Sequence, residues 1–159
     1  MTESGKTTLG KQLCRIQRQC GFKTIVLDPM HDPEWQADFK THSPDVFLRM
    51  LWQSRRCMAF IDEAGKHAGR FDDLMEETAT ESRHWGHSMF YLSQRGAMLS
   101  PTIRGQCKHL FLFAMAADDT KELARNFNCP QLKEANILQP GEYFHVTRFG
   151  IFERCRAWE

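Results

Sequence analysis

The residues best suited to chemistry lie in the segment 2–9, which reads Thr-Glu-Ser-Gly-Lys-Thr-Thr-Leu. Within it, Gly5-Lys6-Thr7 matches the second half of the phosphate-binding pattern G-x-x-x-x-G-K-[ST]. In that pattern backbone N–H groups at a helix start bind an anion, the lysine contacts the terminal phosphates and the hydroxyl holds Mg²⁺. We therefore predict an ATP site at Ser4, Gly5, Lys6, Thr7 and Thr8, in which Thr7 is also a metal ligand.

A second candidate is the segment 57–63, Cys-Met-Ala-Phe-Ile-Asp-Glu. An apolar strand that ends in two carboxylates can deliver Asp62 to a Mg²⁺ ion and place Glu63 beside a water molecule that it orients and deprotonates. The alternative is a core strand with a solvated acidic end. Because the pair follows Gly5-Lys6-Thr7 in the order that a nucleotide hydrolase requires, the functional interpretation is favoured.

Alternating helices and strands must position these groups. The apolar periodicity predicts a helix at 6–19, a buried strand at 23–27 and an irregular connection at 30–43. Further helices are expected at 44–53, 71–85, 100–106, 118–127 and 130–136, and further strands at 57–61, 88–93 and 108–115. A terminal hairpin is expected from 142–147 and 151–158.

This order predicts an α/β sandwich, in which ligands bind at the carboxyl ends of the strands. Lys6, Thr7, Asp62, Glu63 and Gln94 are all expected at such ends. Their convergence at one edge of the sheet is stronger evidence than any single motif.

Length and composition bound the alternatives. The 159 residues are enough for one domain, 1–159, and the apolar fraction of 42% is enough for a packed core. No apolar run is long enough to cross a bilayer and no secretory leader is visible, so a cytoplasmic protein is expected. The six cysteines form no C-x-x-C pair, which indicates reduced thiols. A net charge of +1 gives no general attraction to nucleic acid, so any basic surface must be local or built by several copies.

Three blocks resemble the HerA/FtsK superfamily of P-loop motor ATPases: the loop 2–8, Phe60-Ile-Asp-Glu-Ala64, and the segment 82–95. The last contains an arginine, a glycine three residues on, an apolar strand and a terminal Ser-Gln-Arg. Looser matches follow at 103–106 and 138–142, so that the resemblance covers nearly the whole chain and is most like a viral, phage-type genome-packaging ATPase.

The resemblance implies a RecA-like three-layer P-loop fold with a mainly parallel central sheet and a C-terminal hairpin. It implies that Gln94 senses the γ-phosphate or the lytic water, and that Arg83 is an arginine finger acting on the neighbouring subunit, with Arg95 and Arg104 as second choices. An exposed helix-end cation is the simpler interpretation of Arg83.

The implied function is Mg²⁺-dependent ATP hydrolysis by a ring of five or six subunits that moves double-stranded DNA. A portal protein, or a capsid or membrane assembly protein, is a candidate partner, and the host cytoplasm or the virion is the expected location. The alternatives are an ATPase that drives filamentous-phage-type assembly or export at a membrane, a nucleotide switch or small-molecule kinase, and a degenerate domain that does not hydrolyse.

The sequence also departs from the family pattern. Glu3 stands where the loop usually has glycine and would bring negative charge close to a bound phosphate. The first glycine of the loop and the strand that normally precedes it are missing, which predicts a gap in the middle of the sheet. Loop cations such as Lys66, His67 and Arg70 are candidates for DNA-phosphate contacts, although solvated loop charges are the simpler interpretation.

Overall fold

A computed structural model describes residues 5–64 and 70–158 and contains two β-sheets. The first is parallel, in the order β2-β1-β3-β4, and the second is antiparallel, in the order β5-β6-β7. The strands are β1 (Lys23–Leu27), β2 (Phe39–Thr41), β3 (Cys57–Ile61), β4 (Ser88–Tyr91), β5 (His109–Phe113), β6 (Glu142–Thr147) and β7 (Phe152–Arg156). The helices are α1 (Lys6–Gln19), α2 (Pro44–Gln53), α3 (Arg70–Glu81), α4 (Pro101–Gln106) and α5 (Ala117–Asn126), with 3₁₀ turns η2 (Ser82–Trp85), η3 (Gly96–Met98) and η4 (Pro130–Ile137).

The expected α/β sandwich and terminal hairpin are confirmed, with two differences. The segment expected to be irregular, 30–43, contains the short edge strand β2. The predicted central sheet is divided into two, because β5 pairs antiparallel with β6 and not with β4. Among the described strands none lies between β4 and β5, which agrees with the predicted gap.

Local sequence explains where the helices begin. Ser43 caps α2 by accepting a hydrogen bond from the Val46 N–H at 3.4 Å, and Ser100 caps α4 through the Ile103 N–H at 3.2 Å. A proline follows each cap, where its missing N–H costs nothing. These signals explain why the sequence placed both starts correctly.

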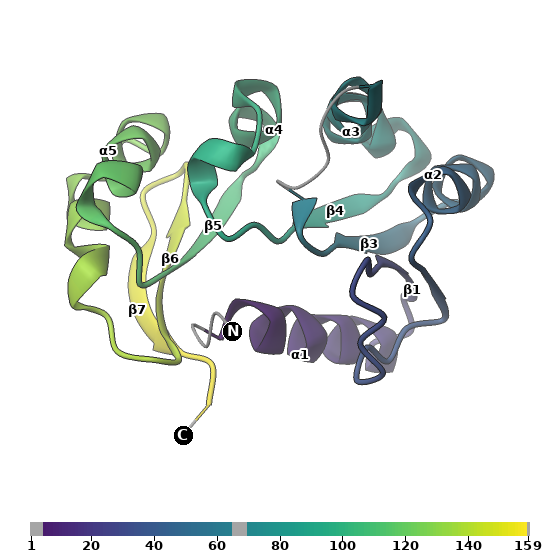
Figure 1. Cartoon of the computed structure of the whole chain (residues 1–159), viewed down its shortest axis with the longest axis horizontal. Helices are drawn as coiled ribbons and strands as arrows, with labels where there is room; N and C mark the ends of the chain where they lie inside the picture. Colours follow the sequence, from purple (N-terminus) through teal and green to yellow (C-terminus); the bar gives the residue numbers. More distant parts are fainter. Residues whose placement is uncertain (1–4, 65–69, 159) are drawn as a thin grey trace.

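The parallel sheet is covered on both faces (Figure 1), with α1 on one side and α2, α3 and α4 on the other. Leu27 and Ile61 pack with Phe47 of α2 in one core cluster, whereas Val26 and Phe60 pack with Cys14 of α1 in another. Each fully buried large side chain contributes about 1.5–3 kcal/mol, so both layers hold the strands in place.

Helix α1 also contacts the small sheet, and so connects the two halves of the molecule. Leu9 packs with Phe113 and Ala157 in a separate core cluster. Gly5, which precedes α1, lies against Trp158; a Cβ added there would come within 2.5 Å of the indole. The start of α1 is therefore fixed by packing as well as by its own hydrogen bonds.

The register of the parallel strands aligns their carboxyl ends. Leu27 of β1 pairs with Ile61 of β3, and Ile61 pairs with Tyr91 of β4. The residues that follow these strands therefore meet at one edge of the sheet.

No helix in the described part of the chain is long and apolar enough to cross a membrane. All six cysteines are free thiols, and Cys20 alone is exposed.

Candidate active site

The structure brings three of the predicted site residues into contact at the carboxyl edge of the parallel sheet. Lys6 Nζ, in the first turn of α1, lies 3.5 Å from Glu63 Oε1. The Gln94 side-chain amide donates a hydrogen bond of 3.2 Å to the same oxygen. Consecutive members of this group lie more than thirty residues apart in the sequence. The fold brings them together at the edge where the sequence motifs predict them.

Glu63 has an unusual backbone conformation, with φ of 54°. A non-glycine residue in this left-handed region is strained by about 1–3 kcal/mol, and such strain is concentrated at functional sites. The turn is held on both sides, because the Asp62 carboxylate accepts the Glu63 N–H at 2.9 Å and the Ala64 N–H bonds to the Leu92 carbonyl at 2.8 Å. The strained turn directs Glu63 to Lys6 and Gln94 instead of letting it continue the strand.

Asp62 is buried, with only 4% of its surface exposed. Burial raises the pKa of its carboxyl above the usual value, and the nearby Lys6 ammonium acts in the opposite direction. A buried carboxylate at a strand end, with one lysine nearby to stabilise its negative charge, is suited to hold a cation.

Asp28 is a further carboxylate of this edge, which the sequence analysis did not identify as a site residue. It follows β1, as Asp62 follows β3, and it is 1% exposed. Its Oδ1 accepts the Met30 N–H at 3.1 Å, but its Oδ2 is buried with no hydrogen-bond partner among the described residues. In the sequence, Asp28-Pro29 indicates only the end of a strand. The signal that marks Asp28 is that it directly follows β1, as Asp62 directly follows β3.

The start of α1 has the geometry of an anion-binding turn. Gly5 has φ of 96°, a left-handed conformation that favours glycine, and Leu9 N–H bonds to its carbonyl at 2.8 Å. Thr7 is partly buried and Thr8 is exposed, while the predicted contact Ser4 lies outside the described residues. Lys6 Nζ is buried and has no hydrogen-bond acceptor within 5–64 and 70–158, so its donors are available to a ligand.

The charges of this edge favour binding of a divalent cation together with a phosphate. Lys6 lies close to Glu63 and acts on Asp62, which is also affected by the charge of Asp28, so a triphosphate alone would add negative charge to an acidic site. Mg²⁺ binds through one or two carboxylates plus substrate phosphates. No group of three or more His, Cys, Asp or Glu side chains in the described part of the chain could hold a metal ion. The residues present therefore fit a Mg²⁺-nucleotide better than a metal ion alone.

The three candidate arginine fingers are in different environments. Arg83 is exposed in η2, immediately before β4, and so lies at the edge of the sheet opposite to Lys6. Arg95 is exposed and pairs with Asp119 at 2.9 Å. Arg104 is buried, with 6% exposure, and contacts Glu122 at 2.8 Å, so it is the least suited to reach another subunit.

Two cations of α1 form ion pairs with the segment 30–43. Lys11 on α1 pairs with Asp32 and Glu34, and Arg18 pairs with Asp38 at 3.2 Å, so these helix cations serve local ion pairs. The His31 and His42 rings are in contact, with centroids 4.3 Å apart and planes tilted by 37°. Glu3, Lys66 and His67 lie outside the described residues, and nothing is described of the Arg70 side chain.

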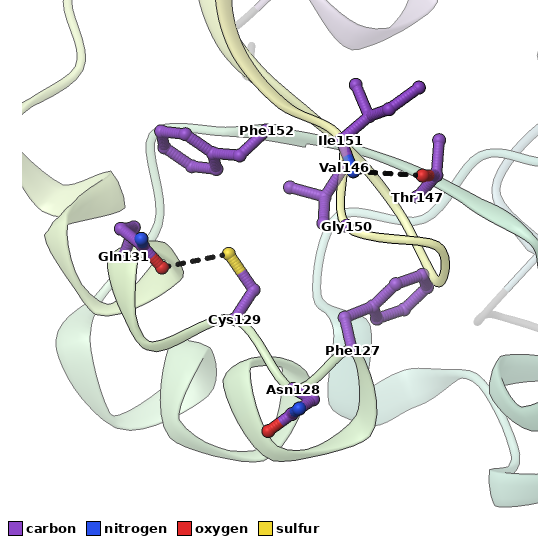
Figure 2. A pocket seen from close by; sticks show the side chains of 9 residues that line it. All are labelled: Phe127, Asn128, Cys129, Gln131, Val146, Thr147, Gly150, Ile151 and Phe152. Carbon is purple, nitrogen blue, oxygen red and sulfur yellow. Dashed lines mark hydrogen bonds between the residues drawn. The ribbon is translucent and has the colours of Figure 1, made fainter.

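A second concave feature lies at the hairpin turn between β6 and β7 (Figure 2). It is a cavity of about 150 Å³ whose lining includes Phe127, Cys129, Val146 and Ile151. No charged residue lines it, so it does not suit a triphosphate. Figure 2 shows Cys129 directed towards Gln131, with the thiol 3.3 Å from the amide oxygen.

Comparison with solved structures supports the assignment of the fold. The chain superposes on the genome packaging NTPase B204 from Sulfolobus turreted icosahedral virus 2 in complex with AMPPCP, with a TM-score of 0.78 at 14% identity over 96% of this chain and 91% of that one. B204, the DNA-packaging ATPase from Sulfolobus turreted icosahedral virus, gives a TM-score of 0.74 at 15% identity, with coverages of 96% and 91%. VirB4 of Thermoanaerobacter pseudethanolicus gives 0.53 at 15% identity over 77% of this chain and 41% of that chain. No protein-family model matches the sequence, and no curated protein sequence matches it. At these identities the likeness establishes a shared α/β fold.

Proposed function

We propose that the protein is an ATPase that hydrolyses ATP at the carboxyl edge of the parallel sheet. The observation that supports this best is the contact of Lys6 and Gln94 with the same oxygen of Glu63, beside the buried Asp62. A phosphate-binding lysine, a metal-binding aspartate, a base and a polar sensor are the parts that phosphoryl transfer to water requires.

Each residue has a role that follows from its position. The N–H groups at the start of α1 and Lys6 bind the β- and γ-phosphates, and Gly5 allows the backbone to approach them. Glu63 accepts a proton from the attacking water, and Gln94 fixes the orientation of Glu63 through its hydrogen bond. Glu63 is paired with Lys6, and a bound γ-phosphate would compete with this carboxylate for the lysine.

Thr7 and Asp62 are the residues that would hold Mg²⁺. When bound, the ion supplies positive charge that offsets the phosphates and the surrounding carboxylates. Asp62 is suited to this because it is buried, with the Asp28 carboxylate and the Lys6 ammonium close enough to affect its charge. The hydroxyl of Thr7 lies in the first turn of α1, one residue after Lys6.

The ATPase is proposed to move double-stranded DNA as a ring of subunits, in a viral genome-packaging motor. The support is indirect: two of the structural neighbours are packaging NTPases, and one of those was crystallised with AMPPCP. The geometry adds a second reason. Arg83 lies at the opposite edge of the sheet from Lys6, so it could act only on the nucleotide of another copy, in a head-to-tail contact. Repeated head-to-tail contacts close into rings when the rotation allows it.

The test is steady-state ATP hydrolysis by the purified chain, with and without Mg²⁺ and with and without double-stranded DNA. The proposal expects hydrolysis that needs Mg²⁺ and increases with DNA and with protein concentration. Mg²⁺-dependent hydrolysis without any effect of DNA would support the ATPase and contradict the motor. Absence of nucleotide binding at millimolar ATP would contradict both.

A further inference from the structure

We infer that Asp28 is a second cation-holding carboxylate of the active site, which acts with Asp62 to retain the divalent ion that accompanies the nucleotide. This inference rests on the proposed function and adds a residue to it. The argument depends on strand register, on burial and on one unpartnered oxygen.

The register places the two carboxylates side by side. Asp28 and Asp62 each follow one of the paired residues Leu27 and Ile61, and the Asp62 N–H bonds to the Leu27 carbonyl at 3.0 Å. Neighbouring parallel strands are separated by about 4.8 Å, so equivalent positions hold side chains close together.

The strand alternation directs both side chains to the face covered by α1. Val26 and Phe60, two positions earlier on each strand, pack with Cys14 of that helix. Because side chains on one face recur every second residue, Asp28 and Asp62 continue this face past the ends of β1 and β3. The same helix carries Lys6 and Thr7 in its first turn.

The hydrogen bonding of Asp28 is incomplete in a way that indicates a ligand. Its Oδ2 is buried and has no partner among the described residues, and Pro29, which follows it, has no N–H to donate. Lys6 Nζ, at the same edge, is also buried; it forms an ion pair with Glu63 at 3.5 Å but has no hydrogen-bond acceptor among the described residues. An unpaired buried carboxylate oxygen is costly, so its retention requires a compensating group.

Asp38 shows that the fold can satisfy a carboxylate fully when it is only structural. Asp38 accepts hydrogen bonds from the Thr24 N–H, the Thr24 hydroxyl and Arg18. Asp28 Oδ2 receives no such hydrogen bond from the described residues. A hydrated divalent ion supplies both the positive charge and the donor that Asp28 lacks.

The test uses Mn²⁺ as the probe for the divalent site, detected by electron paramagnetic resonance. Binding is measured to the full chain with and without a non-hydrolysable ATP analogue, for wild type, Asp28→Asn and Asp45→Asn. Asp45 is an exposed aspartate at the start of α2 and is the matched control. Asp28→Asn is expected to weaken Mn²⁺ binding at least about tenfold in both arms, since it removes one of two carboxylates. Asp45→Asn is expected to bind as wild type does.

Two further readouts separate cation binding from a structural role. In EDTA, the affinity of Asp28→Asn for the nucleotide and its thermal midpoint are expected to equal or exceed the wild-type values, because one of two adjacent negative charges is gone. Should that variant fail to fold, Asp28→Ser replaces it, since serine keeps an acceptor for the Met30 N–H. Undiminished Mn²⁺ binding by a folded Asp28 variant overturns the inference, as does a wild type that binds Mn²⁺ in neither arm. A wild type that binds Mn²⁺ through Asp28 but binds no nucleotide supports the inference and contradicts the proposed function.

Discussion

Lys6 Nζ lies 3.5 Å from Glu63 Oε1, so the residue predicted to bind phosphate is paired with the residue predicted to activate water. Both side chains are largely buried, with 16% and 13% exposure. The ion pair holds the proposed base against the proposed phosphate ligand. A γ-phosphate that attracts the lysine therefore couples binding to the availability of Glu63.

Lys6→Ala is expected to weaken ATP binding by about ten- to one hundredfold, because it removes a charge-assisted contact worth about 1.5–3 kcal/mol. Isothermal titration calorimetry with an ATP analogue measures the change. Lys23→Ala is the matched control. The Lys23 side chain is 77% exposed, and it lies at the start of β1, whereas the site lies at the carboxyl ends of the strands. Equal affinities of the two variants would exclude Lys6 from the site.

Gln94→Ala is expected to lower kcat by about tenfold or more and to leave KM within about threefold, because it removes a group that orients the base and contributes little to ground-state binding. The affected contact is the 3.2 Å hydrogen bond to Glu63. Gln131→Ala, an exposed glutamine beside the hairpin cavity, is the control. A rise in KM with unchanged kcat would show that Gln94 binds the substrate and the transition state equally, and would contradict its role in orienting the base.

Arg83→Ala is expected to lower hydrolysis by about 10³-fold if the arginine acts in trans. Mixing Arg83→Ala with Lys6→Ala subunits should then restore part of the activity, because each variant supplies what the other lacks. Arg125→Ala, an exposed arginine on α5, is the control. Activity that is linear in subunit concentration and unaffected by Arg83→Ala would contradict the trans role.

The hairpin sheet gives a prediction about acid stability. The Arg154 side chain, with the Gln139 N–H and Arg156, lowers the pKa of Glu142 from 4.5 to about 2. Because the folded value is depressed, this stabilisation is complete above the unfolded pKa near 4.5 and is lost as the pH falls towards 2. Arg154→Ala should therefore flatten the decrease in urea midpoint between pH 5 and 3, whereas Arg15→Ala on exposed α1 surface should not. Parallel curves for wild type and Arg154→Ala would contradict the assignment.

The sequence predicted those parts of the site that depend on short motifs and on strand order. Lys6, Asp62, Glu63 and Gln94 were all expected at one edge because buried parallel strands deliver their next residues there. The left-handed backbone of Glu63 could not be predicted, since nothing in its residue type requires φ of 54°. It results from contacts with residues far along the chain.

Other features were missed for identifiable reasons. Asp28 carries no motif, and its role depends on a register partner thirty-four residues away. The edge strand β2 has three residues, which are too few to show the alternation of apolar and polar side chains that predicts a strand. The gap between β4 and β5 was predicted, but the antiparallel pairing of β5 with β6 was not, because the apolar run of β5 suits either neighbour. Long-range pairing, not local preference, decided each case.

The central claim is that Glu63 activates water for hydrolysis at a site that binds ATP through Lys6. Its most direct test is Glu63→Gln, a nearly isosteric change, with nucleotide affinity and single-turnover hydrolysis measured on the same preparation. We predict affinity within about threefold of wild type and hydrolysis lower by about 10²–10⁴-fold, the range that a general base contributes. Hydrolysis by Glu63→Gln at the wild-type rate, or a wild type that binds ATP and never cleaves it, would contradict the account.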